Sequence, residues 1–275
     1  MYDDPTFLKQ QFLRIHGYEL NLENPKTFSE KMQWIKVYGN LERRAIYTDK
    51  YEVRKFVKEK IGEQYVVPLI GMYENVDDID FESLPKSFAM KATHGSGWNI
   101  IVRDKSVIDW NAVKKEIMGW VRSNYYEVAG ERNYKPLKGR IVVEEFLQDP
   151  SGDLKDFKFF CFHGKPMYIQ VDGDRFRGHR RDIYDLHWNR LPVQIHFKNL
   201  REAAEKPNRL DEMIQIAALL SERMAFVRVD LYFTNNRIYF GELTFVPGIG
   251  LERFNPVKFD EVFGKSIDLS KYHQE

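Results

Sequence analysis

The sequence predicts an α+β protein that begins with a helical segment. Helix signals fill about the first 62 residues, short apolar runs of strand length dominate from Tyr65 onward, and residues 226–250 form two apolar runs around a pair of asparagines. The 275 residues are enough to bury a core, either in one large domain or in two to three small lobes.

The composition is that of a globular protein, and its charge balance does not point to a nucleic-acid or membrane surface. Hydrophobic residues make up 43% and charged residues 30% of the chain, and the net charge is only +1. The single cysteine, Cys161, excludes an internal disulfide, and its apolar neighbours predict a small buried residue. The N-terminus has no signal-peptide core, and no apolar run approaches the roughly 18 residues of a spanning helix. We therefore expect a cytoplasmic protein with no membrane span.

Two helices are predicted in the N-terminal segment. Thr27 and Glu30 have the spacing of a capping box and precede an apolar run. A second helix is expected from about residue 48 to residue 62. Lys50 and Arg54 lie four residues apart on it, so they share a face that is either solvated or turned towards a substrate.

Strands and helices follow in the remainder of the chain. Short apolar runs bounded by polar residues predict the strands, and Asp109 is placed to cap a helix. The predicted strands are residues 66–70, 88–92, 100–102, 140–147, 157–162 and 166–171, and the predicted helices are residues 109–125 and 210–224.

The two apolar runs near the C-terminus predict a β-hairpin with its turn at the asparagines. Side chains alternate along a strand, so Arg228 and Asp230 share one face, and Glu242 and Thr244 share one face of the partner strand. A loop with an odd number of residues would place Asp230 opposite Glu242, and two facing carboxylates favour a bound cation such as Mg²⁺. A two-residue turn without a bulge would put the acids on opposite faces. In an ordinary surface hairpin they would pair with Arg228 or with water.

Lys91 ends an apolar run and is followed by Gly95-Ser96-Gly97 and a further strand. This order predicts a hairpin tip rather than a Walker A loop, in which a helix follows the glycines. Glycine N–H groups can approach an anion closely and Lys91 adds a positive charge, so a phosphate site is one interpretation. A plain turn is the other.

Two further polar clusters are candidates for ligand contacts. Glu144 and Glu145 end an apolar strand, whose edge could offer backbone groups to an adenine and a carboxylate to a ribose. Two exposed acids are the alternative. Residues 175–182 contain four arginines and a histidine, which suit phosphate or carboxylate oxygens, although a solvated basic loop has the same composition.

The order of these features resembles the nucleotide site of ATP-grasp proteins. A strand lysine, a glycine-rich hairpin tip and an acidic strand end precede Arg-x-Asp and Glu-x-Thr, which close on Pro-Gly. Longer motifs resemble the TupA-like ATP-grasp family in particular, over roughly residues 24–256. These motifs are Asn24-Pro25-Lys26-Thr27-Phe28-Ser29-Glu30-Lys31, Asp49-Lys50-Tyr51-Glu52-Val53-Arg54, His94-Gly95-Ser96-Gly97-Trp98-Asn99, Asp156-Phe157-Lys158-Phe159-Phe160 and Gly241-Glu242-Leu243-Thr244-Phe245.

The resemblance implies an ATP-grasp fold, in which two α+β lobes grip ATP beneath a glycine-rich lid. It divides the chain into an N-terminal helical segment at residues 1–64, a smaller lobe at 65–140 and a C-terminal lobe with the metal site at 141–275. The family is associated with the synthesis of teichuronopeptide and other bacterial surface polysaccharides, and its members are often labelled glycosyltransferases.

The same resemblance implies roles for individual residues. Asp230 and Glu242 would bind Mg²⁺, with Arg228 beside the transferred phosphoryl group. Thr244 stands where many members have Asn, which leaves open whether one or two Mg²⁺ ions bind. The implied ATP contacts are Lys91 at the α- and β-phosphates, the backbone of Gly95, Ser96 and Gly97 as the lid, the backbones of Glu145 and Leu147 at adenine with Glu144 nearby, and Lys158 at the γ-phosphate.

By this resemblance we expect a ligase that uses ATP and Mg²⁺ to convert a carboxylate to an acyl phosphate, which an amine attacks to form an amide. The carboxylate would be a uronic acid of a surface polysaccharide or of its lipid-linked precursor, with peripheral lipid contact in the latter case, and the amine would be an amino acid. Arg175, Arg180 and Arg181 would bind the carboxylate and the acyl phosphate, and Arg228 and Lys158 would complete the catalytic set. The alternatives are an ATP-grasp kinase that phosphorylates a sugar or polysaccharide precursor, a glycosyltransferase that binds a nucleotide sugar, and a binding protein without turnover.

Overall fold

The computed structural model describes residues 4–149, 152, 154–173 and 178–274, and the chain divides into two compact units. Unit 1 comprises Met1–Asn40 and Asp149–Glu275, and unit 2 comprises Leu41–Gln148. The division implied by the sequence has its boundaries near residues 64 and 140. Both units combine helices with antiparallel sheet, which confirms the α+β class.

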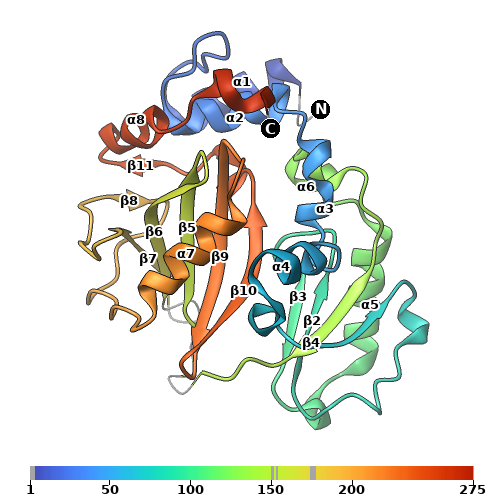
Figure 1. Ribbon diagram of the computed structural model, residues 1–275. Helices are drawn as coiled ribbons and strands as arrows, with labels where there is room; N and C mark the ends of the chain where they lie inside the picture. Colours follow the sequence, from blue (N-terminus) through green and yellow to red (C-terminus); the bar gives the residue numbers. More distant parts are fainter. Residues whose placement is uncertain (1–3, 150–151, 153, 174–177, 275) are drawn as a thin grey trace. The chain divides into compact units, whose positions relative to one another are not determined.

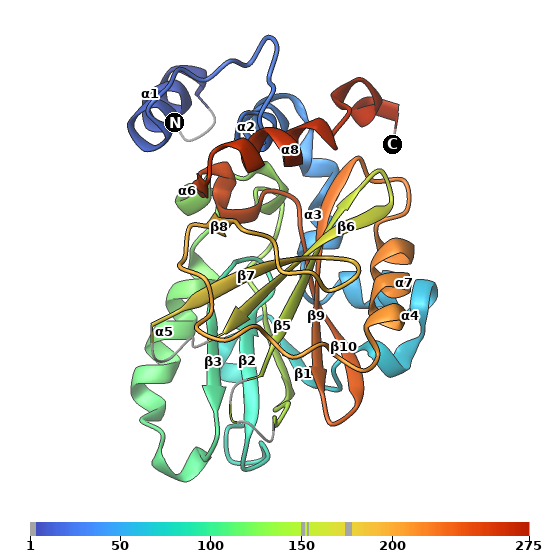
Figure 2. The ribbon, with the colours of Figure 1, turned by 90° about the vertical axis from the view of Figure 1, so that its left-hand side faces the viewer.

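Unit 2 is built on a four-stranded antiparallel sheet in the order β1-β4-β2-β3, and helix α5 packs against it at β2 (Figures 1 and 2). Apolar side chains of the sheet and of α5, among them Phe88, Met90, Ile117 and Val143, form its core. The elements are η1 (Leu41–Arg44), α3 (Ala45–Thr48), α4 (Val53–Ile61), η2 (Glu63–Tyr65), β1 (Leu69–Tyr73), η3 (Val76–Asp78), β2 (Phe88–Ala92), β3 (Asn99–Val102), η4 (Lys105–Val107), α5 (Trp110–Arg122), α6 (Tyr126–Ala129), η5 (Arg132–Tyr134) and β4 (Ile141–Glu145).

The helix predicted from residue 48 is interrupted at its start. Helix α3 ends at Thr48, and α4 begins only at Val53. Between them the carboxylate of Asp49 accepts hydrogen bonds from the backbone N–H groups of Tyr51 and Glu52 at 2.8 and 3.0 Å. An aspartate that binds the backbone ahead of it competes with helical hydrogen bonding, so the segment 49–52 forms a turn of its own.

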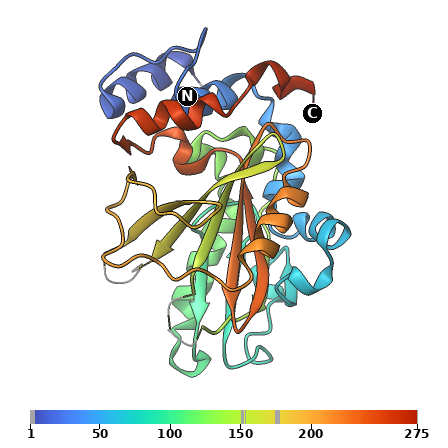
Figure 3. The same cartoon turned by 60° about the vertical axis from the view of Figure 1, so that its left-hand side comes forward.

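Unit 1 is built on a five-stranded antiparallel sheet in the order β10-β9-β5-β6-β7, and α7 packs across β5, β6 and β9 (Figures 1 and 3). A two-stranded ladder of β8 and β11 and the packed helices α2 and α8 complete the unit. The elements are α1 (Pro5–His16), α2 (Phe28–Tyr38), β5 (Asp156–Phe162), β6 (Lys165–Gly173), β7 (Arg180–Asp185), β8 (Gln194–Ile195), α7 (Leu210–Leu220), β9 (Phe226–Thr234), β10 (Arg237–Thr244), η6 (Pro247–Gly250), β11 (Phe254–Asn255), α8 (Lys258–Lys265) and η7 (Leu269–Gln274).

The start of α2 confirms the predicted capping box. The Thr27 side chain accepts from the backbone N–H of Glu30 at 3.1 Å, and the Glu30 carboxylate accepts from the backbone N–H of Thr27 at 3.0 Å. Phe28, which follows Thr27 and begins α2, packs edge-to-face against Phe226 and Phe263. The cap therefore fixes the point at which α2 enters the aromatic core of unit 1.

Strand β5 has one face that is apolar throughout and an opposite face that is polar at Asp156 and Lys158 and apolar at Phe160 and Phe162. Phe157, Phe159 and Cys161 point to the face that α7 covers, where the Cys161 thiol lies 3.8 Å from a backbone oxygen of that helix. Cys161 is fully buried, as its apolar neighbours predict. Asp156 and Lys158 alternate with these residues and therefore point to the opposite face.

In the part of the chain that the structure describes, no helix has both the length and the apolar character needed to cross a bilayer.

Candidate functional site

The closing hairpin brings the two predicted metal ligands together. Strands β9 and β10 are joined by a two-residue turn at Asn235 and Asn236, whose φ angles of 49° and 58° suit a type I′ turn. The ladder shifts by one residue between Phe240 and Glu242, and beyond this bulge Glu242 pairs with Asp230. The loop does not hold the odd number of residues that the sequence argument required. The bulge supplies the missing residue instead.

Arg228 connects this pair to Thr244. Its guanidinium makes two hydrogen bonds to the Asp230 carboxylate, each 2.7 Å long. The same group donates to Thr244 Oγ1 at 3.1 Å, and the threonine hydroxyl donates to Glu242 Oε1 at 3.1 Å. Burial lowers the pKa of Arg228, but the adjacent Asp230 outweighs it and holds that pKa above its ordinary value.

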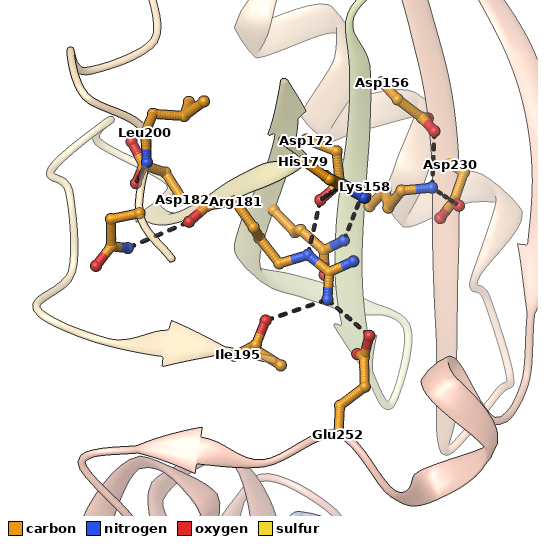
Figure 4. A network of polar contacts seen from close by, with 12 residues as sticks. Asp156, Lys158, Asp172, His179, Arg181, Asp182, Ile195, Leu200, Asp230 and Glu252 are labelled. Carbon is orange, nitrogen blue, oxygen red and sulfur yellow. Dashed lines mark hydrogen bonds and ion pairs between the residues drawn. The ribbon is translucent and has the colours of Figure 1, made fainter. Parts of the chain in front are cut away.

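Lys158 lies on the neighbouring strand β5, between two carboxylates (Figure 4). Its ammonium group is 2.6 Å from Asp230 and 2.7 Å from Asp156. Burial disfavours the charged amine, yet Asp156 and Asp230 together raise the pKa of Lys158 above its usual range. Lys158 is therefore a fixed cation between the two acids.

Arg181, on the far strand β7, is also held by two carboxylates (Figure 4). Its Nε donates to Asp172 at 2.7 Å and its Nη1 donates to Glu252 at 2.8 Å. The side chain of Arg181 is 6% exposed, whereas that of Glu252 is 18% exposed. Arg180 precedes it on the strand, points to the other face and donates to a backbone oxygen of Asn199, so the two arginines do not converge. Arg175, the third predicted arginine, lies outside the described residues.

The donor set at the hairpin suits a hard divalent cation in company with phosphates. Asp230 and Glu242 offer carboxylate oxygens and Thr244 a hydroxyl, and Mg²⁺ is usually held by one or two carboxylates plus substrate phosphates. Within the described part of the chain, no three His, Cys, Asp or Glu side chains are grouped closely enough to hold a metal ion by themselves. Asp230, Glu242 and Thr244 thus form a two-carboxylate set of the kind that holds Mg²⁺ together with further oxygen ligands.

In unit 2, the predicted glycine-rich tip connects β2 and β3. Lys91 pairs with Asn99 in the ladder, so residues 93–98 form the connection, as the hairpin prediction required. Ser96 and Gly97 are exposed, and the loop is anchored on either side of them. On one side His94 is buried with its Nε2 2.9 Å from the backbone oxygen of Trp120, and on the other Trp98 packs on the His94 ring.

The predicted phosphate lysine and the strand-end acid are in direct contact. Lys91 Nζ donates to Glu144 Oε2 at 2.7 Å, and Arg54 donates to Glu144 Oε1 at 2.8 Å. Glu144 is buried and Glu145 is exposed, because neighbouring strand residues point to opposite faces. The backbone N–H of Glu145 donates to Pro68 at 3.0 Å. Leu147 follows the end of β4 and is half-buried.

Several contacts around these groups were not predicted from the sequence. Asp156 could have been found, because it stands two residues before Lys158 and must share its face. Asp172 and Glu252 contact Arg181 across separations of 9 and 71 residues, and Arg54 reaches Glu144 across 90. No local sequence pattern predicts those pairings.

The sheets, the glycine-rich tip and the acidic hairpin together define the ATP-grasp class of fold. A D-alanine–D-alanine ligase from Bacillus anthracis, solved in complex with ATP, superposes with a TM-score of 0.50 at 16% identity, over 83% of this chain and 64% of that chain. The corresponding ligase from Helicobacter pylori gives a TM-score of 0.46 at 12% identity, over 90% of this chain and 66% of that one. The present chain thus spans less than two thirds of the Bacillus anthracis ligase.

A family model narrows the class. The model described as TupA-like ATPgrasp matches residues 30–268, and the chain therefore belongs to the TupA-like ATP-grasp family. Comparison with curated protein sequences finds no match.

Proposed function

We propose that this protein is a ligase that binds Mg²⁺ and ATP and joins a carboxylate to an amine through an acyl phosphate. The observation that carries the proposal is the cross-strand pair of Asp230 and Glu242, with Arg228 bound to both Asp230 and Thr244. Family membership supports the use of ATP. A bound Mg²⁺, held by Asp230 and Glu242, would neutralise phosphate charge.

The remaining side chains have roles that follow from their charges. Lys158 and Arg228 are buried cations beside the acidic pair and would stabilise charge that develops on a transferred phosphoryl group. Arg181 would bind the substrate carboxylate. The substrate would then take the place of Glu252 on the Nη1 atom of Arg181. In unit 2, Lys91 would bind the α- and β-phosphates, and the exposed tip at Ser96 and Gly97 would cover them.

Adenine would bind at the end of β4. The N–H of Glu145 already donates to Pro68, so a contact by Glu145 would use its carbonyl oxygen as acceptor for the adenine amino group. Leu147, two residues on, would supply a backbone N–H to the ring. This pair of contacts needs an extended segment just beyond the strand, and β4 ends at Glu145.

We propose that the carboxylate is a uronic acid of a surface polysaccharide or its precursor and that the amine is an amino acid. This choice of substrates follows from the resemblance of the sequence motifs to the TupA-like family, to which the chain belongs.

The first test is calorimetric titration of ATP, with and without Mg²⁺, into the wild type, Asp230→Asn and Glu242→Gln. Mg²⁺-dependent binding that both variants weaken is the expected result. Glu202→Gln, which removes an exposed acid of the same unit, is the matched control and should bind as the wild type does. Equal binding by all four proteins would remove the metal role from the hairpin.

The second test separates the possible reactions by the release of inorganic phosphate. A ligase releases phosphate only when a uronic acid and an amino acid are both present. Formation of ADP with a sugar alone would indicate a kinase. Binding of a nucleotide sugar in place of ATP would indicate a glycosyltransferase.

A further inference from the structure

The turn between α3 and α4 is attached to the glycine-rich connection of unit 2. The backbone N–H of Lys50 donates to the backbone oxygen of Thr93 at 3.0 Å, and its ammonium group donates to that of Gly95 at 2.5 Å. Asp49 accepts from Arg140 at 2.9 Å, and Arg140 in turn precedes β4. The segment from Asp49 to Arg54 therefore lies against the residues that would hold phosphate.

Arg54 also connects this segment to the predicted phosphate lysine, because Arg54 and Lys91 bind the same carboxylate, that of Glu144. Its Nη1 donates to Glu144 Oε1 and its Nη2 donates to the backbone oxygen of Val67 at 2.7 Å, while Lys91 binds the other oxygen of Glu144. The three side chains, here called the bridged cluster, are 11%, 8% and 19% exposed for Arg54, Glu144 and Lys91. Water therefore screens their charges only partly.

The charge of the bridged cluster depends on Arg54. Lys91 and Glu144 alone form a neutral pair, whose field at a nearby phosphate largely cancels. Burial lowers the pKa of Arg54 and Glu144 raises it, but a guanidinium stays protonated at neutral pH. With Arg54 present, the cluster carries a net charge of +1, since two cations share one carboxylate.

We propose that Arg54 is a positioning residue for the nucleotide: it neutralises Glu144 and so leaves the charge of Lys91 available to the phosphates. This inference rests on the proposed ATP site. It reassigns Arg54 from a substrate-facing or solvated residue to the support of that site. The guanidinium acts through Glu144 and makes no contact with ATP itself.

The test compares ADP and adenosine as titrants, because only ADP carries the phosphates. Arg54→Met should weaken ADP binding about tenfold and leave adenosine binding within about twofold, since a unit charge at this depth has an effect of that order. Glu144→Gln removes the negative charge of the bridged cluster, so this variant should bind ADP at least as tightly as the wild type. The double variant Arg54→Met with Glu144→Gln restores a net charge of +1 and should recover most of the lost affinity.

Two further variants complete the design. Lys55→Met removes a positive charge from the same helix at a side chain that is 85% exposed, and should bind ADP as the wild type does. Arg54→Lys keeps the charge and should retain most of the affinity. Thermal melting reports whether each variant is folded, and if Arg54→Met is unfolded, Glu144→Gln still tests whether a more positive cluster binds ADP at least as tightly as the wild type does.

The outcomes separate this inference from the proposed function. Wild type that binds no ADP would overturn the nucleotide site, and this inference with it. Wild type that binds ADP would overturn the role of Arg54 alone if Arg54→Met bound equally well. The same conclusion would follow if Glu144→Gln bound ADP more weakly, or if the double variant showed no recovery.

Discussion

Glu242 lies directly across the β9–β10 ladder from Asp230, and the bulge at Gly241 is the reason. The two-residue turn alone would set Gly241 opposite Asp230 and turn Glu242 to the other face of the sheet. The extra residue returns Glu242 to the face of Arg228 and Lys158. The acidic pair is thus a product of one backbone irregularity.

Gly241→Ala should loosen this arrangement. A β-carbon at Gly241 would lie 3.0 Å from the backbone oxygen of Asp230 and 3.2 Å from the Tyr232 ring, which is tighter than ordinary contact. We expect a loss of about 1–2 kcal/mol in the free energy of unfolding and weaker Mg²⁺-dependent ATP binding. Denaturant unfolding and calorimetry measure the two effects.

Gly119→Ala is the matched control for the added methyl group. Nothing lies within 4 Å of a β-carbon at that position in α5, so the substitution should gain about 0.5–1 kcal/mol from helix propensity. Unchanged stability and metal response in Gly241→Ala would show that the bulge does not constrain Glu242.

Lys158→Met should be strongly destabilising in a way that Mg²⁺ partly reverses. The substitution removes the cation between Asp156 and Asp230, and the loss of one partner from a buried ionic cluster costs about 3–5 kcal/mol. A divalent cation at Asp230 would restore some of the missing positive charge. We therefore expect Mg²⁺ to raise the melting temperature of the variant more than that of the wild type.

Lys165→Met, at an exposed position of the adjacent strand β6, serves as the control and should respond to Mg²⁺ as the wild type does. An equal response to Mg²⁺ in Lys158→Met and wild type would argue against a metal ion beside Lys158.

Asp260 should make the stability of unit 1 depend on pH. Burial raises the pKa of this carboxyl from 3.8 to about 6, although it accepts a hydrogen bond from the backbone N–H of Ser29 at 2.8 Å. Between these values the folded chain binds the proton more tightly than the unfolded chain does. The stabilisation is therefore complete below pH 3.8 and is lost as the pH rises through about 6.

Asp260→Asn keeps an oxygen acceptor for Ser29 and removes the titration. Relative to wild type, the variant should gain about 2–3 kcal/mol in the free energy of unfolding between acidic and neutral pH. Urea unfolding over a series of pH values measures this difference. Glu261→Gln changes the adjacent exposed acid of α8 and should leave the pH dependence of the free energy of unfolding as it is in the wild type. If Asp260→Asn also left that pH dependence unchanged, the Asp260 carboxyl would titrate normally in the folded chain.

Local chemistry made the capping box and the hairpin turn predictable. Thr27 and Glu30 bind each other's backbone, and Asn235 and Asn236 tolerate the positive φ angles of their turn, so both signals lie within a few residues. The bulge was not predictable in the same way. A glycine in a strand is compatible with either a bulge or regular pairing, and only the whole ladder decides between them.

Pairings between distant strands limited the prediction of the site. The basic run around Arg181 predicted an arginine that binds a ligand, but in the structure Arg181 is already bound by Asp172 and Glu252. Lys158 was likewise predicted as a phosphate contact without its two carboxylate neighbours. The contacts to Asp172 and Asp230 depend on the strand order β9-β5-β6-β7, which no single segment encodes. Asp156, by contrast, precedes Lys158 on the same strand.

The two-sided character of β5 restricts how this chain can change in length. Insertion of one residue into the strand would turn Asp156 and Lys158 under α7 and bring Phe157 and Phe159 to the polar face. No neighbouring substitution could compensate, because the exchange would affect two layers at once. A change of length within β5 therefore requires a bulge that restores this alternation, as the extra residue at Gly241 does in β10, whereas the connections between strands can change length without one.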